Sequence, residues 1–312
     1  MALAAVCAVA MCVLAFIFRP ELPFSGLSGI CLPPPSEWGL PPVASWIINV
    51  LLLGATAAAI WRLNHKFNFN RTTRPVLPAL FLVFVASDPW ITVELSSSLI
   101  MCAANVVALW LLFSVYDSPD ATQPMFVTGT FISIGSMFEY AFVPMVAVYL
   151  IAAIVLKIFR VKEIMAFILG LVAPYWVCLG FGWISPLQFQ IPSPSPLFSD
   201  PSQAADLFLL VLSAGIAVLF GLAFGIADAI KIYAGNSRVN AMNSVIVWMG
   251  IICAVCMTID FNNLPAYLAT LFFCVALQFA NLCALWQIRH EWLVSLIPSA
   301  VYVALFVLMV FI

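Results

Sequence analysis

Charged residues are scarce in this chain, and their scarcity excludes an ordinary water-soluble fold. Only 8% of the 312 residues are Asp, Glu, Lys or Arg, whereas soluble domains carry about 25%. Hydrophobic residues make up 65% of the chain, and its mean hydropathy is +1.15. A surface so poor in charge must face lipid. With 11 Lys and Arg against 13 Asp and Glu, the chain also lacks the basic excess of nucleic-acid-binding proteins.

Several motifs are absent as well. The chain contains only two histidines, His65 and His290, and each lies beside Arg or Lys at the end of an apolar run, so we expect no metal site. There is no P-loop, no Gly-rich dinucleotide motif, no HExxH and no Ser-His-Asp set. These absences exclude ATP-driven transport by this chain alone, and the sequence identifies no cofactor.

The nine cysteines predict no disulfide framework, because only Cys31 lies in a long loop and the others lie in apolar runs.

The N-terminal apolar run, residues 2–18, lacks a basic region before it and a small-residue cleavage site after it. We therefore expect it to be a retained first span rather than a signal peptide.

Long apolar runs dominate the chain and predict an all-α, polytopic transmembrane helical bundle. A bilayer core about 30 Å thick needs roughly 17–25 helical residues, and the runs lack the period-2 alternation of a membrane barrel. The sequence predicts a single integral membrane domain over residues 1–312. Eleven candidate spans lie at roughly 2–18, 44–61, 76–87, 95–115, 125–138, 141–156, 164–182, 206–229, 244–259, 266–286 and 293–311.

Two of these runs, 76–87 and 125–138, are short for a span. At 1.5 Å per residue they reach only about 18 and 21 Å, so each is either a tilted span or a re-entrant half-helix. If both re-enter, nine spans remain and the loop at 116–120 moves to the outer side. Broken helices at membrane depth are tolerated only where protein or a water-filled cavity covers their ends, so we expect a functional site in this half of the chain.

The basic residues predict the orientation, because cytoplasmic loops of membrane proteins are rich in Lys and Arg. With the N-terminus in the cytoplasm, ten of the 11 basic residues fall inside and only Arg19 stays outside. The two long outer loops, 19–43 and 183–205, are rich in proline and aromatic residues. They either lie on the lipid headgroups or form a lid over an outward-facing cavity.

Three outer carboxylates are candidate catalytic residues. Asp88 and Glu94 flank the segment Pro89-Trp90-Ile91-Thr92-Val93, and Glu139 follows the second short run. Ionisable groups near hydrocarbon are costly and often functional. Each acid also has a structural interpretation. Asp88, which precedes a proline, would begin a turn, and Glu94 would lie at a helix start, where acids are favoured. The run before Glu139 contains Ser133 and Ser136, and these small residues would serve close helix packing.

Other polar residues have simpler interpretations. Arg19 is a candidate for binding a lipid phosphate, or it snorkels to the headgroups at the end of its helix. Asn105, Gln278 and Asn281 lie inside apolar runs, where hydrogen bonds between helices are expected. The glycine pair in Gly221-Leu-Ala-Phe-Gly225 is typical of close helix packing.

From about residue 70 to 183, the chain resembles an uncharacterised family of polytopic inner-membrane proteins from Bacteroidota. The matching stretches are Phe131-Ile-Ser-Ile-Gly-Ser-Met-Phe138 with Pro144, then Phe159-Arg-Val-Lys-Glu163, then Gly170-Leu-Val-Ala-Pro174. The resemblance implies a multi-pass protein of the cell inner membrane and assigns no catalytic residue.

The layout is also similar to that of C-type membrane glycosyltransferases, which have a cytoplasmic N-terminus, many spans and acids in their outer loops. This similarity implies transfer of a sugar from a polyprenyl-phosphate carrier in envelope glycan assembly. An outer carboxylate, Glu139, Asp88 or Glu94, would act as general base, and Arg19 or a divalent ion would offset the phosphate charge. Two alternatives stay open: a secondary transporter or flippase, and a non-catalytic membrane subunit or scaffold.

Overall fold

A computed structural model of the chain describes residues 2–18, 29–67, 76–185, 187, 189, 208–231, 237–286 and 291–311. Within these residues the structure contains helices and connections and no strand, which confirms the predicted all-α class. The α-helices are α1 (Ala2–Phe18), α2 (Pro42–Phe67), α3 (Val76–Ala86), α4 (Pro89–Thr92), α5 (Ser97–Ser114), α6 (Thr122–Phe138), α7 (Met145–Val155), α8 (Val161–Gly180), α10 (Phe208–Lys231), α11 (Ser237–Ile259), α12 (Leu264–Leu285) and α13 (Glu291–Phe311). Three short 3-10 helices are η1 (Pro35–Glu37), η2 (Tyr140–Phe142) and η5 (Phe261–Asn263).

Several helices extend beyond the apolar runs that predicted them. Helix α11 begins at Ser237 rather than near residue 244, and α2 continues to Phe67 rather than ending at 61. The second short run is also longer than predicted, because α6 spans 17 residues from Thr122. In each case polar residues at the end of the run keep the helical conformation outside the apolar stretch, since a helix satisfies its backbone hydrogen bonds with or without lipid around it.

Seven helices among the described residues are long and apolar enough to cross a membrane: α2, α5, α8, α10, α11, α12 and α13. Helices α1, α3 and α7 are apolar but shorter. The chain therefore has the helices of a membrane-embedded protein.

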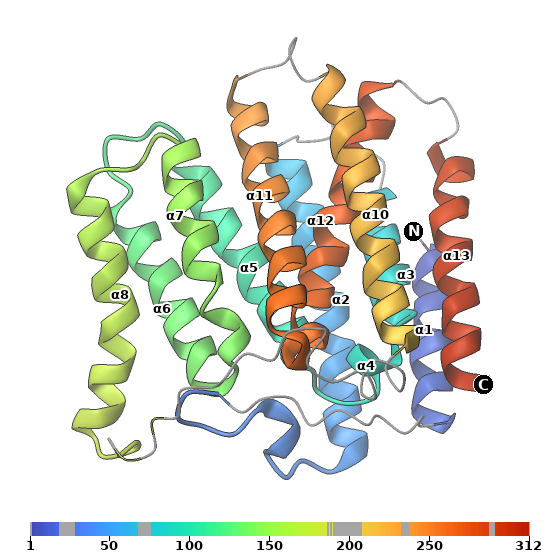
Figure 1. Cartoon of the computed structure of the whole chain (residues 1–312), viewed down its shortest axis with the longest axis horizontal. Coiled ribbons are helices and arrows are strands. Elements are labelled where there is room, and N and C mark those ends of the chain that lie inside the picture. Colours follow the sequence, from blue (N-terminus) through green and yellow to red (C-terminus); the bar gives the residue numbers. More distant parts are fainter. Residues whose placement is uncertain are drawn as a thin grey trace.

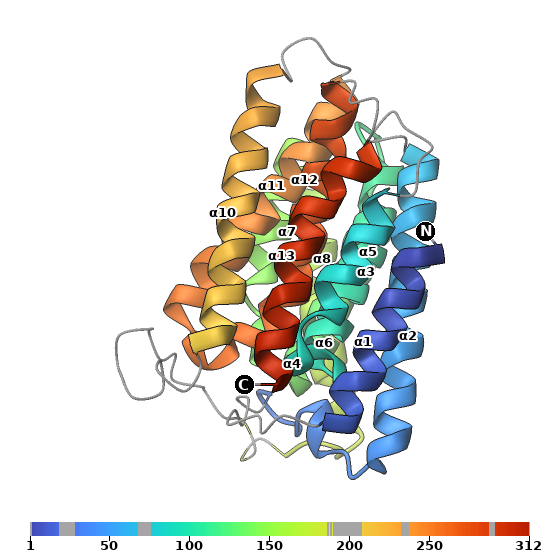
Figure 2. The same cartoon turned by 90° about the vertical axis from the view of Figure 1, so that its right-hand side faces the viewer.

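The helices lie side by side along one direction, and the chain reverses at each connection (Figures 1 and 2). Helix α12 runs through the middle of the bundle and is almost wholly buried. It packs against α3, α5, α10 and α11, while α6, α7 and α8 form one flank of the bundle (Figure 1).

Buried polar side chains link α12 to its neighbours. The Asn105 amide of α5 donates to Thr270 Oγ1 of α12 at 3.2 Å and accepts from the Tyr149 hydroxyl of α7 at 2.7 Å. This confirms the predicted interhelical role of Asn105. The Gln278 side chain of α12 lies against Gly221 and Gly225 of α10, so that glycine pair serves close packing, as expected.

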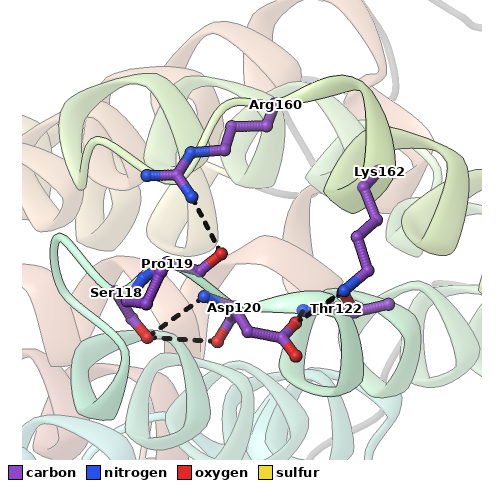
Figure 3. Close-up of polar contacts among 6 residues, drawn as sticks. All are labelled: Ser118, Pro119, Asp120, Thr122, Arg160 and Lys162. Carbon is purple, nitrogen blue, oxygen red and sulfur yellow. Dashed lines mark hydrogen bonds and ion pairs between the residues drawn. The ribbon is translucent and has the colours of Figure 1, made fainter.

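The two ends of the bundle differ. We call the end that carries α4, η2 and η5 the α4 end; it lies at the bottom of Figure 1. At the opposite end, two connections meet (Figure 3). Arg160 Nη1 donates to the Pro119 carbonyl at 2.8 Å, and Lys162 Nζ lies 3.4 Å from Asp120 Oδ1. The α5–α6 and α7–α8 connections therefore lie at the same end of the bundle.

Candidate functional site

Two buried carboxylates end helices at the α4 end. Glu139 directly follows Phe138, the last residue of α6, and its N–H donates to the Gly135 carbonyl at 2.8 Å. Asp260 directly follows α11, where its N–H donates to the Cys256 carbonyl at 2.8 Å. The two residues are 3% and 4% exposed. Both acids thus occupy helix C-termini, where the helix dipole disfavours negative charge.

These acids converge with side chains from three other elements to form what we call the carboxylate cluster: Glu139, Asp260, Ser97, Asn263 and Tyr267. Ser97 begins α5 and hydrogen-bonds the Glu139 carboxylate. Asn263 Nδ2 of η5 donates to Asp260 Oδ2 at 2.7 Å. The Tyr267 hydroxyl, in the first turn of α12, lies close enough to both carboxylates for their charges to act on it.

Several buried oxygen atoms of the cluster lack a hydrogen-bond partner within it. Glu139 Oε1 and Asp260 Oδ1 are buried and have no hydrogen-bond partner, and the buried Tyr267 hydroxyl has the Cys256 thiol as its hydrogen-bond neighbour. Among the residues that the structure describes, no Lys or Arg contacts either carboxylate. Buried charges are normally paired or bound to an ion, so this arrangement is costly for the fold and calls for a functional explanation.

The surroundings favour the protonated form of both acids. Burial raises the pKa of Glu139 from 4.5 to about 7, the Ser97 hydrogen bond opposes this shift, and the charge of Asp260 adds to it. Burial also raises the pKa of Asp260, against the hydrogen bond from Asn263. The cluster therefore changes its charge near neutral pH, which is the behaviour needed to bind and release an ion or a proton.

Residues 29–32 of the loop between α1 and α2 cover the end of α6 beside Glu139. The N–H groups of Ile30 and Leu32 donate to the Ser136 and Met137 carbonyls at 3.1 and 2.9 Å. Gly29 lies so close to the Met137 carbonyl that any Cβ would collide with it. This part of the loop is therefore held against the end of the bundle.

Asp88 occupies a different place at the same end. It is fully buried and precedes α4, where its Oδ1 accepts from the Trp90 N–H at 3.0 Å. Its Oδ2 accepts from the Ser213 hydroxyl of α10 at 3.5 Å, and the Tyr302 hydroxyl of α13 donates to the Ser213 carbonyl at 3.2 Å. Asp88 thus follows a turn, as its position before Pro89 predicts. It also caps the start of α4, which was predicted of Glu94 and not of Asp88, and it joins α4 to α10 and α13.

The predicted site residues do not form one site. The described contacts of Asp88 include no member of the carboxylate cluster. Glu94 is exposed on the bend between α4 and α5. Arg19 lies outside the described residues, and much of the loop at 183–205 does too.

Asp260 and Tyr267 were not predicted as site residues. Like Glu139, Asp260 directly follows a long apolar run, and this position is the sequence signal that could have identified it. Nothing in the sequence pairs the two acids, because their helices are far apart along the chain. Tyr267 has no distinguishing sequence signal among the aromatic residues of apolar runs.

A separate cavity lies away from the carboxylates. It has a volume of about 690 Å³ and is lined mainly by apolar side chains of α1, α3 and α13, with Glu291, Ser295 and Ser299 among them. Because Val76 and Glu291 begin α3 and α13, the cavity lies towards the end of the bundle opposite the carboxylate cluster. Within the described residues, no three His, Cys, Asp or Glu side chains gather as a metal site.

Compared with known proteins, the chain matches no family model, no curated protein and no solved structure.

Proposed function

We propose that this chain is an ion-coupled secondary transporter of the cell inner membrane, with the carboxylate cluster as its coupling site. The observation that carries the proposal is the pair of buried carboxylates, Glu139 and Asp260, which have unpartnered oxygens and no cationic partner in the described part of the chain. In membrane proteins, such acids mark ion pathways and proton relays.

The proposal includes eleven spans and a cytoplasmic N-terminus. The contacts of Arg160 with Pro119 and of Lys162 with Asp120 support eleven rather than nine spans. If both short segments re-entered the membrane, these two connections would lie on opposite sides of the bilayer. The clustering of basic residues supports a cytoplasmic position for this end, with the α4 end facing outwards.

Binding and release at the cluster require helices to separate. The carboxylates lie between α5, α6, α11 and α12 and are almost fully buried, so an ion reaches them only when these helices or the covering loop move. Alternating exposure of a buried ion site by relative motion of helix groups is the general mechanism of secondary transport. The flank formed by α6, α7 and α8 is the natural moving group, because Glu139 ends α6 and Asp260 belongs to the central helices (Figure 1).

The test is solute uptake by proteoliposomes that contain trapped pH-sensitive and Na⁺-sensitive dyes. A panel of radiolabelled amino acids, sugars, organic acids and nucleosides is added under an imposed ion gradient. We expect one solute class to accumulate together with ion movement. Glu139→Gln and Asp260→Asn should abolish both, whereas Glu37→Gln, which removes an exposed acid of the first outer loop, should preserve both. Uptake that persists in the Glu139→Gln/Asp260→Asn double variant, or no uptake of any solute by folded protein, would refute the proposal.

A second function, sugar transfer from a polyprenyl-phosphate carrier, is favoured by the position of Glu139 beneath the first outer loop. In this alternative Glu139 is the general base. The chain has no Asp just after its first span and no pair of acids separated by one residue in either of the first two outer loops, which distinguishes it from the C-type enzymes. A transfer assay with a polyprenyl-phosphate sugar tests this alternative. If neither acid variant alters any envelope phenotype caused by deletion of the gene, a scaffold role is supported instead.

A further inference from the structure

We propose that the carboxylate cluster is a Na⁺ site. This inference rests on the proposed transport function and specifies its coupling ion. It follows from three features of the cluster: its free oxygen atoms, the helix ends that meet there, and its charge.

The free atoms of the cluster are carboxylate oxygens. Glu139 Oε1 and Asp260 Oδ1 are unpartnered and buried, and they belong to the residues that directly follow α6 and α11. Carboxylate and neutral oxygens are the ligands that hard, non-transition cations take in proteins. The Tyr267 hydroxyl of α12 is a neutral oxygen beside them. The Cys256 thiol is its hydrogen-bond neighbour, but a soft thiol does not attract such an ion.

Two helices direct their C-terminal ends at this place. Helix α6 ends at Phe138 and α11 ends at Ile259, each one residue before an acid of the cluster. A helix C-terminus carries about half a negative charge, which destabilises a carboxylate and stabilises a cation. Sodium sites of transporters use helix C-terminal ends in the same way. The placement of both acids is thus unfavourable in the empty protein and favourable once a cation is bound.

The charge of the cluster fits a monovalent ion. The titratable groups that face Glu139 are Asp260 and Tyr267, and Asp260 faces Cys256 as well. No positive side chain is among them. One Na⁺ together with one proton neutralises the two carboxylates. A divalent ion normally takes six or more oxygen ligands, with several carboxylates, and the described part of the chain offers no third acid here.

The test is Na⁺ binding to the purified full chain in detergent, measured by calorimetry and by the thermal shift, with choline chloride maintaining the ionic strength. We expect NaCl to raise the melting temperature at pH 8, while KCl has a smaller effect. Glu139→Gln and Asp260→Asn should lose the Na⁺ response, and Tyr267→Phe should weaken it. Asp88→Asn is the matched control, since it alters a buried acid at the same end outside the cluster and should keep the response.

Each result separates this inference from the proposed function. A wild-type protein with no Na⁺-specific response, whose proton-coupled uptake is still abolished by Glu139→Gln, overturns the Na⁺ inference and leaves the transporter intact. A Na⁺ response that survives in Tyr267→Phe and in both acid variants shows that Na⁺ binds elsewhere. Specific Na⁺ binding that the cluster variants abolish, without uptake of any solute, supports the site and overturns the transport function.

Discussion

At the scale of single residues, the molecule places acids where its helices disfavour them. Glu139 and Asp260 end α6 and α11, and neither finds a cation among the described residues. Asp88 is equally buried but begins a helix, where its carboxylate accepts the Trp90 N–H and the Ser213 hydroxyl. A buried carboxylate therefore stabilises the start of α4, whereas the buried carboxylates that follow α6 and α11 depend on a bound ion or proton.

Glu139 should make the protein less stable as the pH rises. Folding raises the pKa of Glu139 from 4.5 to about 7, so the folded state binds more protons than the unfolded state between these values. Its favourable contribution is complete below pH 4.5 and is lost as the pH rises through 7. In Na⁺-free buffer, the free energy of unfolding of Glu139→Gln minus that of wild type should therefore be larger at pH 8 than at pH 5. The difference should be on the order of 3 kcal/mol. Thermal melts at the two pH values measure this difference; an equal offset at both would show that Glu139 does not titrate in this range.

At the scale of elements, α6 and α8 approach each other through glycine. Gly129 of α6 lies against the backbone of α8, where a Cβ would come within 2.5 Å of the Phe167 carbonyl oxygen, and Gly170 of α8 is similarly close to the Phe126 carbonyl of α6. The two helices lie next to each other at the edge of the bundle (Figure 1). This close contact fixes the helix that ends in Glu139.

Substituting either glycine should therefore loosen the flank of the bundle. Gly129→Ala and Gly170→Ala should each lower the free energy of unfolding by about 1–3 kcal/mol, because the backbones must separate to admit a methyl group. Gly54→Ala in α2 is the control, since nothing lies within 4 Å of its added Cβ, and helix propensity alone should stabilise it by up to about 1 kcal/mol. Unfolding in denaturant measures all three; equal stability of the three variants would contradict close α6–α8 packing.

At the scale of the whole molecule, the carboxylate cluster lies at the end of the bundle opposite the basic connections. The connections that carry Asp120, Arg160 and Lys162 meet at the basic end (Figure 3). Residues 29–32 and the carboxylate cluster lie at the other end. The proposed orientation therefore predicts which loops are accessible from outside the cell.

Cysteine labelling of intact cells tests the orientation and the number of spans. In a Cys31→Ser background, Glu37→Cys should react with an impermeant maleimide from outside, and Asp117→Cys should react only after the cells are opened. Both residues are exposed in the structure, so a difference in labelling reports the side of the membrane. Labelling of both sites from outside would indicate nine spans, and labelling of Asp117→Cys alone would indicate the reverse orientation.

The sequence by itself determined the features that depend on neighbouring residues. Apolar length and scarce charge predict membrane helices, because lipid imposes the same requirement on every residue of a span. The Asp-Pro pair at 88–89 predicts a turn, and the structure places the connection between α3 and α4 there. The seven long apolar helices follow the same local rule.

The tertiary structure alone decided which polar groups meet. Glu139 lies with Asp260 and Tyr267 because α6, α11 and α12 end or begin at one place in the bundle, and no local pattern encodes the order in which apolar helices pack. Asn105 likewise hydrogen-bonds Thr270, which lies 165 residues away in the sequence. Lipid solvates all apolar helix faces equally well, so it does not determine which helices pack together. The packing partners of each helix depend on small-residue contacts and buried hydrogen bonds, which exist only after the helices have assembled.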